Sequence, residues 1–101
     1  MLSEKAEQII KIYSLFGIKI KGLMDAAFED GIARFDFEVE PNTDFAKIKK
    51  YRDDVSLMLS VPSANLISPL PDKSAFRIKI LAKTKNSYFW SEPQSLDKIK
   101  Y

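Results

Sequence analysis

The amino-acid sequence predicts an α+β domain, a two-layer sandwich with helices on one face of a mainly antiparallel sheet. Two segments have apolar residues at helical spacing, and others alternate apolar with charged residues as half-buried strands do. The predicted element order is α-β-β-α-β-β. With 46% hydrophobic residues among 101, the chain has enough apolar material for one core.

The first helix is expected in residues 2–17, "LSEKAEQIIKIYSLFG". Ser3 is placed to cap its start and Gly17 to end it. Its apolar face consists of Leu2, Ala6, Ile9, Ile10, Tyr13 and Phe16.

Two strands are expected next, because apolar and charged residues alternate in residues 18–21 and again in residues 34–39. Between them the stretch "EDG", residues 29–31, supplies a glycine that tolerates the positive φ of a hairpin turn. Glu29 and Asp30 are therefore interpreted as turn residues.

A second helix is expected from Asp44 to Leu59, with Thr43 or Asp44 as its cap and Pro62 closing it. The stretches "ANLIS" and "AFRIKILAK" then predict two more strands. After Lys83 the periodicity is lost. Residues 1–83 are therefore predicted to form the domain, and residues 84–101 an edge strand or a linker leading out of it.

The composition excludes several kinds of chemistry. Sixteen basic and fourteen acidic residues leave a net charge of +2, so a basic surface would need local clustering. The chain has no cysteine and no histidine, which removes thiolate metal sites, the usual zinc ligands and the usual general base. We expect a protein that is not an enzyme by itself. The N-terminal "MLSEKAEQ" is not an apolar leader, so a cytoplasmic location is expected.

The loop "SPLPDKS", residues 68–74, contains a Lys-Ser pair of the kind that ends a phosphate-binding P-loop. A P-loop needs glycines whose N–H groups wrap the phosphate, whereas Pro69 and Pro71 remove two donors and Asp72 adds a negative charge. A stiff connection between strands is the better interpretation. Asp53 and Asp54 are adjacent on a helix and point about 100° apart, so they do not converge as an acid/base pair.

Nucleic-acid binding has two candidate features. Lys47, Lys49, Lys50 and Arg52 form a basic cluster, but helical spacing distributes it around the helix, and a solvated face is favoured. Phe35, Phe37 and Phe76 occupy alternate strand positions, where bases could stack, although core packing is favoured. The candidate phosphate contacts are Lys47, Lys50 and Lys73.

Residues 2–80, about four-fifths of the chain, resemble the small α domain that precedes the RecA-like motor core of FtsK/SpoIIIE DNA translocases. Members open with a helix rich in Glu, Lys and Ala that ends in Gly-Val or Gly-Ile, like "LSEKAEQIIKIYSLFGIKI" here. The stretch "DGIARFDFE" is a looser counterpart of the next motif, and "FAKIKKYRDDVSLMLSV" follows the family's Asp-containing helix closely.

The last motif falls in residues 63–80, "SANLISPLPDKSAFRIKI", where members carry Ser-x-Arg-Ile, Pro-Ile-Pro-Gly-Lys-Ser and Gly-Ile-Glu-Val. The family-signature loop that stands in register consists of Pro69, Pro71, Lys73 and Ser74. In this chain Gly31 lacks the following proline, Asn65 replaces arginine and Lys79 replaces glutamate. Asp72 and Arg77 replace glycines, which predicts a different loop conformation.

The resemblance implies a non-catalytic part of an ATP-driven double-stranded DNA translocase. In such proteins hexameric rings encircle duplex DNA, the motor domain uses ATP and magnesium, and the α domain forms a tier that couples the subunits. The implied partners are the motor domain, neighbouring ring subunits and double-stranded DNA. No cofactor and no small-molecule substrate are expected for this chain. Any membrane anchor of the parent would lie in another region.

Two further hypotheses stay open from the residues. The first is a free-standing interaction protein that binds a partner through the edge of its sheet. The second is a small nucleic-acid-binding domain that has lost the motor and uses Lys47, Lys50 and Lys73.

Overall fold

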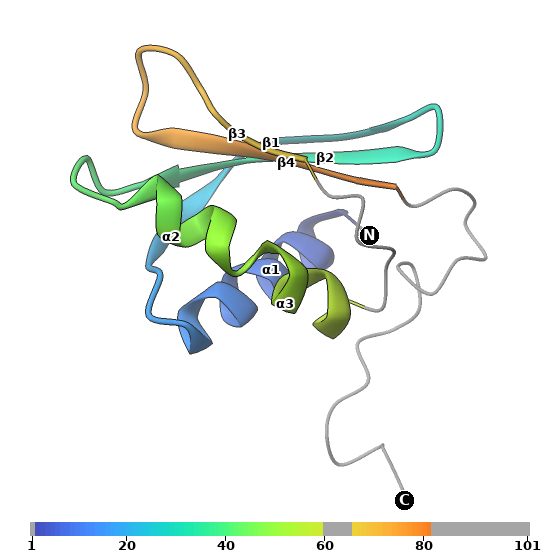
Figure 1. Ribbon diagram of the computed structural model, residues 1–101. Helices are drawn as coiled ribbons and strands as arrows, with labels where there is room; N and C mark the ends of the chain where they lie inside the picture. Colours follow the sequence, from blue (N-terminus) through green and yellow to red (C-terminus); the bar gives the residue numbers. More distant parts are fainter. Residues whose placement is uncertain (1, 60–65, 82–101) are drawn as a thin grey trace, which may run out of the picture.

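A computed structural model describes residues 2–59 and 66–81 of the chain (Figure 1). The α+β class is confirmed. The helices and strands, in chain order, are α1 (Leu2–Leu15), β1 (Ile20–Glu29), β2 (Ile32–Val39), α2 (Phe45–Lys50), α3 (Arg52–Met58), β3 (Leu66–Pro69) and β4 (Ala75–Leu81). Pro62, predicted to close the second helix, and the predicted edge strand or linker in residues 84–101 lie outside the described residues.

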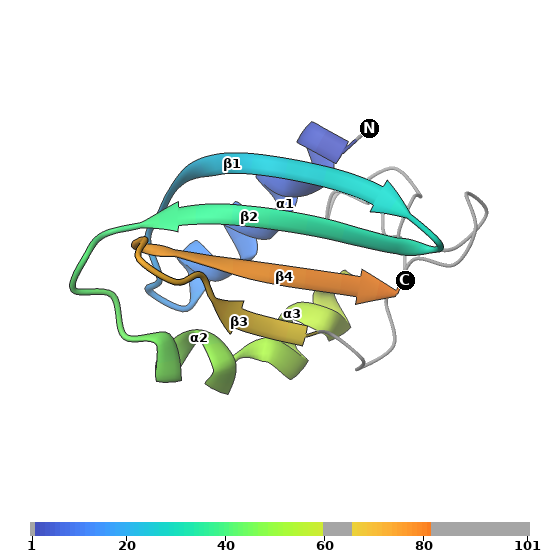
Figure 2. The ribbon, with the colours of Figure 1, turned by 90° about the horizontal axis from the view of Figure 1, so that it is seen from above.

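The four strands form one antiparallel sheet in the order β1-β2-β4-β3. The helices all lie on one side of this sheet (Figure 1), and the strand order is seen from above in Figure 2. Strands β2 and β4 are central, and their inward side chains pack against those of the helices in the core. The other side of the sheet has no helix over it in the described part of the chain.

Helix α1 ends as the sequence predicts, at Gly17. This residue has φ of +78°, and its N–H donates to the Ser14 carbonyl at 3.1 Å while Ile18 N–H donates to the Tyr13 carbonyl at 3.0 Å. Glycine adopts this left-handed conformation without steric cost. The prediction for the start was wrong by a small margin, because Ser3 lies inside α1.

The predicted second helix is divided into α2 and α3 at Tyr51, which has φ of −95° and ψ of 11°. This changes the predicted element order, because two short helices stand where one was expected. Asp44 caps α2, accepting a hydrogen bond from Ala46 N–H at 2.9 Å. At the break the Tyr51 ring stacks on Phe16 with 4.5 Å between centroids, so the junction of α2 and α3 is packed against the end of α1.

The core lies between the sheet and the helices, and its largest side chains are aromatic. Phe35, Phe37 and Phe76 are fully buried, and the Tyr13 ring meets Phe76 edge-on at 5.7 Å between centroids. The phenylalanines therefore belong to the core and are not a platform for stacking bases. Ile48 of α2 and Val55 of α3 cover the same layer.

The hairpin between β1 and β2 turns where the sequence predicts. Asp30 and Gly31 have φ of +53° and +76°, the conformation of a two-residue turn that matches the twist of the strands. Strand β1 is less regular than β2, because its register shifts between Ile20 and Gly22 and again between Leu23 and Asp25.

Candidate functional site

The candidate site lies on the side of the sheet without helices, which we call the open face. Because side chains alternate along a strand, the residues between the core phenylalanines point to this face. Cross-strand partners share a face, and the register pairs Asp36 with Arg77 and Arg34 with Lys79. The open face is therefore charged where the opposite face is apolar.

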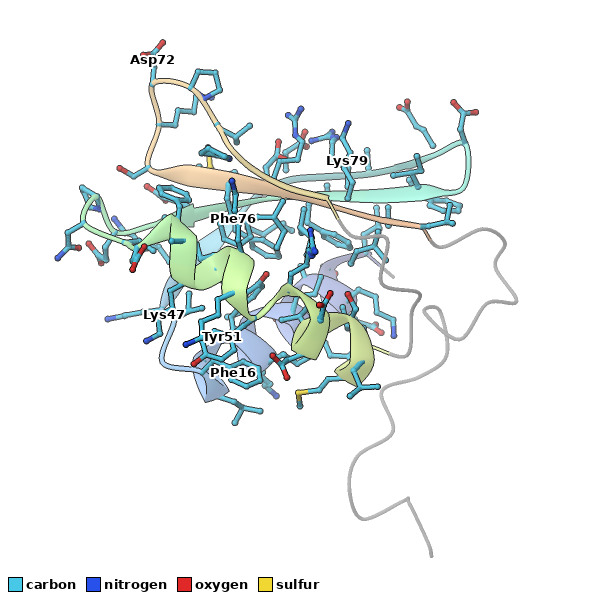
Figure 3. The ribbon with its side chains drawn as sticks, in the orientation of Figure 1. Phe16, Lys47, Tyr51, Asp72, Phe76 and Lys79 are labelled. Carbon is cyan, nitrogen blue, oxygen red and sulfur yellow. The ribbon has the colours of Figure 1, made fainter. Side chains whose placement is uncertain are left out.

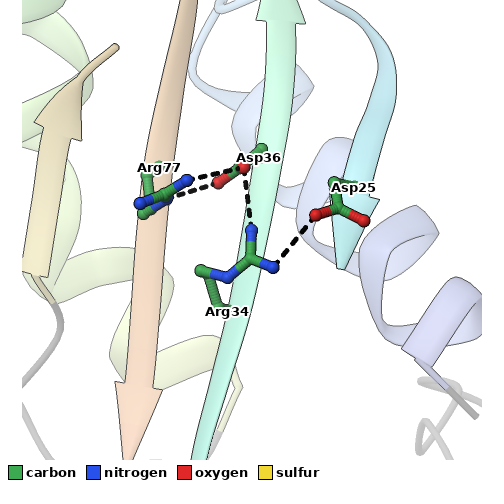
Figure 4. Close-up of polar contacts among 4 residues, drawn as sticks. All are labelled: Asp25, Arg34, Asp36 and Arg77. Carbon is green, nitrogen blue, oxygen red and sulfur yellow. Dashed lines mark hydrogen bonds and ion pairs between the residues drawn. The ribbon is translucent and has the colours of Figure 1, made fainter. Parts of the chain in front are cut away.

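A continuous network of charged residues crosses β1, β2 and β4 and consists of Asp25, Arg34, Asp36 and Arg77 (Figure 4). Asp36 accepts hydrogen bonds from Arg77 Nε at 2.8 Å and from Arg77 Nη2 at 3.0 Å. Its Oδ2 also accepts from Arg34 Nη1 at 2.8 Å, and Arg34 Nη2 donates to Asp25 at 3.0 Å. Asp36 is buried, with 6% of its surface exposed, so its charge depends on these partners.

The electrostatics follow from this geometry. The hydrogen bond from Arg34 holds the pKa of the Asp25 carboxyl below its usual value. The hydrogen bond to Asp36 raises the pKa of the Arg77 guanidinium. Each arginine of the network is thus matched to a carboxylate, and the network does not present the free positive charge that phosphates attract.

A bulge in β1 brings one more side chain to the open face. Leu23 is opposite Phe37 and Asp25 is opposite Asp36, so Met24 between them has no partner on β2. The extra residue lets Met24 and Asp25, although consecutive, line the same hollow. Met24 is 45% exposed, a large value for an apolar side chain.

The loop from Leu70 to Ser74, which joins β3 to β4, rises above the open face (Figure 1). Leu70 N–H donates to the Ala75 carbonyl at 3.0 Å and closes the base of the loop, as a tight connection does. Asp72 lies at its crest (Figure 3) with φ of +58°.

The left-handed backbone at Asp72 bears on the prediction of an altered loop. Glycine, the residue that the resemblance places here, adopts this conformation readily, and aspartate is among the residues that tolerate it. The replacement at Asp72 therefore does not require a different path for the loop. Arg77, at the second glycine position, lies in β4 and supplies the network with two hydrogen bonds.

Between the loop and β1 the open face is hollowed. Two adjacent hollows of about 390 and 300 Å³ share Met24 and Lys73, and we call them together the loop groove. Leu70 and Pro71 form its apolar wall, and the Asp36–Arg77 pair lies at its floor. Three cations (Lys21, Lys73, Arg77) and three carboxylates (Asp25, Asp36, Glu38) line it, so the groove has no net charge.

The predicted site residues do not come together. Lys73, with Pro71 and Ser74 of the family-signature loop, lines the loop groove, and Pro69 ends β3. Lys47 and Lys50 lie on α2, which is across the sheet from the loop (Figure 1). Lys47 approaches Gly17 and Lys50 lies over the Tyr51 ring at 5.6 Å. The three lysines therefore cannot contact one ligand phosphate together.

Sequence reasoning did not single out the network of Asp25, Arg34, Asp36 and Arg77, or Met24. Alternation with the core phenylalanines marked Arg34 and Asp36 as outward-facing, but the pairing with Arg77 required knowledge of which strands are neighbours.

The described residues contain no group of three side chains suited to hold a metal ion. Within the same ranges, no helix has the length and apolar character needed to cross a membrane.

The fold and the groove define a class of protein, a small α+β domain whose open sheet face carries a neutralised charge network beside a projecting loop. No protein-family model matches the chain. Over 80 residues the chain is 31% identical to the DNA translocase FtsK of Caldanaerobacter subterraneus subsp. tengcongensis. This match covers 79% of the chain but 11% of that protein, and it supports a relation to the FtsK family.

Proposed function

We propose that the chain acts as a non-catalytic α domain of an FtsK/SpoIIIE-like DNA translocase and couples motor subunits in a hexameric ring around double-stranded DNA. The similarity to a named translocase carries this proposal, because it covers 79% of the chain and only 11% of the translocase. A chain that corresponds to so small a share of its relative is similar to one part of a larger machine. ATP and magnesium belong to the motor domain of the parent.

The architecture supports a coupling role. The signature loop, with Pro71 and Lys73, projects from the β3–β4 hairpin and walls a groove on the open face. The charges there are largely engaged with each other, so the face offers shape and apolar contact to a protein neighbour. The motor domain and adjacent subunits are the proposed neighbours, in the cytoplasm.

The two alternatives have less support. In the described ranges the two edge strands of the sheet are poor templates for a partner strand, because bulges interrupt β1 and the described part of β3 has four residues and ends at Pro69. Binding of duplex DNA through Lys47, Lys50 and Lys73 would need contacts on both sides of the sheet.

The natural gene provides the first test. The proposal requires a G-x-x-x-x-G-K-[ST] motif downstream in the same reading frame, and a gene that encodes only this domain would contradict it.

The second test deletes residues 1–83 from the parent translocase. We expect DNA-stimulated ATP hydrolysis to remain and displacement of a third strand from duplex DNA to be lost. Unchanged strand displacement would refute a coupling role.

A further inference from the structure

The tip of the β1–β2 hairpin has surface chemistry that is complementary to the loop groove. Glu29 and Asp30 at the tip are exposed, and neither makes an ion pair within residues 2–59 and 66–81. Ile32 is 40% exposed, which leaves an apolar side chain beside the carboxylates. These three residues share a hollow of about 310 Å³ with Arg34 and Lys79, and Arg34 is already engaged by Asp25 and Asp36.

The loop groove offers the matching groups. Lys73 is exposed and has no ion pair among the described residues, whereas Arg77 is bound to Asp36 and Lys21 lies 3.9 Å from Glu38. Beside Lys73 lie Met24 and Pro71, whose apolar surfaces face the hollow. An acidic group with an apolar neighbour therefore fits the groove, and methionine adapts its shape to such contacts.

The tip and the groove lie at opposite ends of the sheet. The register pairs Ile32, next to the tip, with Leu81, and it pairs Glu38 with Ala75, next to the loop. Ile32 and Glu38 are six positions apart along the extended strand, a distance of about 20 Å. The tip cannot reach the groove of its own chain, so a contact between them requires a second copy.

We propose that the hairpin tip of one copy docks in the loop groove of the next, with Glu29 and Asp30 facing Lys73 and Ile32 packing against Met24. Such a contact joins two different surfaces and is directional, so its repetition builds a closed ring or a filament. The inference rests on the proposed function only in that a ring brings identical copies side by side. Exposed ion pairs are weak, so the charges set the orientation while the apolar contact contributes most of the affinity.

Zero-length cross-linking with a carbodiimide tests the contact directly, because it joins a lysine amine to a carboxylate only where the two touch. An equal mixture of ¹⁵N-labelled and unlabelled 101-residue chains is treated and digested, and the linked peptides are identified by mass spectrometry. We expect peptides that join Lys73 of one isotope to Glu29 or Asp30 of the other. Lys73→Arg is the matched control, because it keeps the charge and removes the reactive amine.

Charge reversal tests whether the contact drives association. Lys73→Glu should weaken self-association measured by sedimentation by about ten-fold, and so should Glu29→Lys combined with Asp30→Asn. Asparagine is chosen at position 30 because it tolerates the positive φ there. Combining all three changes should restore association. Lys49→Glu and Asp54→Lys alter exposed charges on the helices and should have no effect.

Three results would overturn the inference: no Lys73 peptide linking the two isotopes, equal loss of association in the helix controls, or no restoration in the combined variant. These outcomes are separable from the proposed function. If the parent translocase needs the domain but the Lys73 cross-link is absent, the docking contact is wrong and the function stands. If the cross-link forms but the gene encodes no motor, the contact stands and the function is wrong.

Discussion

The charge network on the open face gives the most direct test of the structure, through replacement of Asp36. This carboxylate is 6% exposed and accepts three hydrogen bonds from two guanidinium groups, at 2.8, 3.0 and 2.8 Å. In Asp36→Ala these hydrogen bonds are lost, and Arg34 and Arg77 are left facing each other as like charges.

The size of the effect follows from the burial of each partner. A hydrogen bond to a charged group contributes about 1.5–3 kcal/mol, which would give a large sum for three bonds. The arginine side chains are 25% and 35% exposed, however, and water can replace part of what they lose. We therefore expect Asp36→Ala to lower the free energy of unfolding by about 2–4 kcal/mol.

A double-mutant cycle isolates the pair. Urea unfolding followed by circular dichroism is compared for the parent chain, Asp36→Ala, Arg77→Ala and the double variant. We expect a coupling energy of about 2 kcal/mol for Asp36 and Arg77. The Lys21–Glu38 pair is the control, because its side chains are 44% and 52% exposed and 3.9 Å apart, and its coupling should be about 0.5 kcal/mol or less. Equal coupling in the two pairs would refute the argument from burial.

Three other predictions concern single residues. The Tyr13 hydroxyl is buried without a hydrogen-bond partner in the described structure, and burial raises its pKa. Tyr13→Phe should therefore stabilise the fold by up to about 1 kcal/mol, and it should reduce the loss of stability above pH 10, where tyrosine ionises in the unfolded chain. Destabilisation of this variant in urea would contradict the argument. Asp72→Gly should leave the free energy of unfolding unchanged or raise it, whereas Asp72→Ala should lower it by about 1 kcal/mol because φ is positive at this position. Equal unfolding midpoints for the two variants would be inconsistent with that backbone conformation. The carboxyl of Asp25 should titrate by NMR below its ordinary pKa, so its contribution to stability is present above the unfolded-state pKa and is lost as pH falls through the folded-state value. Arg34→Gln should return that pKa toward normal, and an unchanged titration would show that Arg34 is not the cause.

Much of the fold could be predicted because the relevant signals are local. Apolar spacing marks the strands that place Phe35 and Phe76 in the core, and both are fully buried. Gly17 and the turn at Asp30 and Gly31 adopt the predicted positive φ. One error was local, since Ser3 lies inside α1, and the other was the division of the second helix at Tyr51. That division accompanies the stacking of Tyr51 on Phe16, a contact that spacing alone does not reveal.

The candidate site was less predictable, because it is assembled from residues that are distant in the chain. Asp36 and Arg77 are 41 residues apart and meet only because β2 pairs with β4. A list of basic residues groups Lys73 with Lys47, although Lys73 belongs to the loop above the open face and Lys47 to α2 on the other side of the sheet (Figure 1).

The sequence alone determined which segments are helical or extended, apart from the break at Tyr51, and which phenylalanines enter the core, since the period of apolar residues is a property of each segment by itself. Only the tertiary structure decided which strands are neighbours, where the bulge at Met24 falls, and that the signature loop with Lys73 walls a groove on the open face. Strand pairing and register are set by burying all the inward faces together, and so the charges on the opposite face come together through contacts that no single segment specifies.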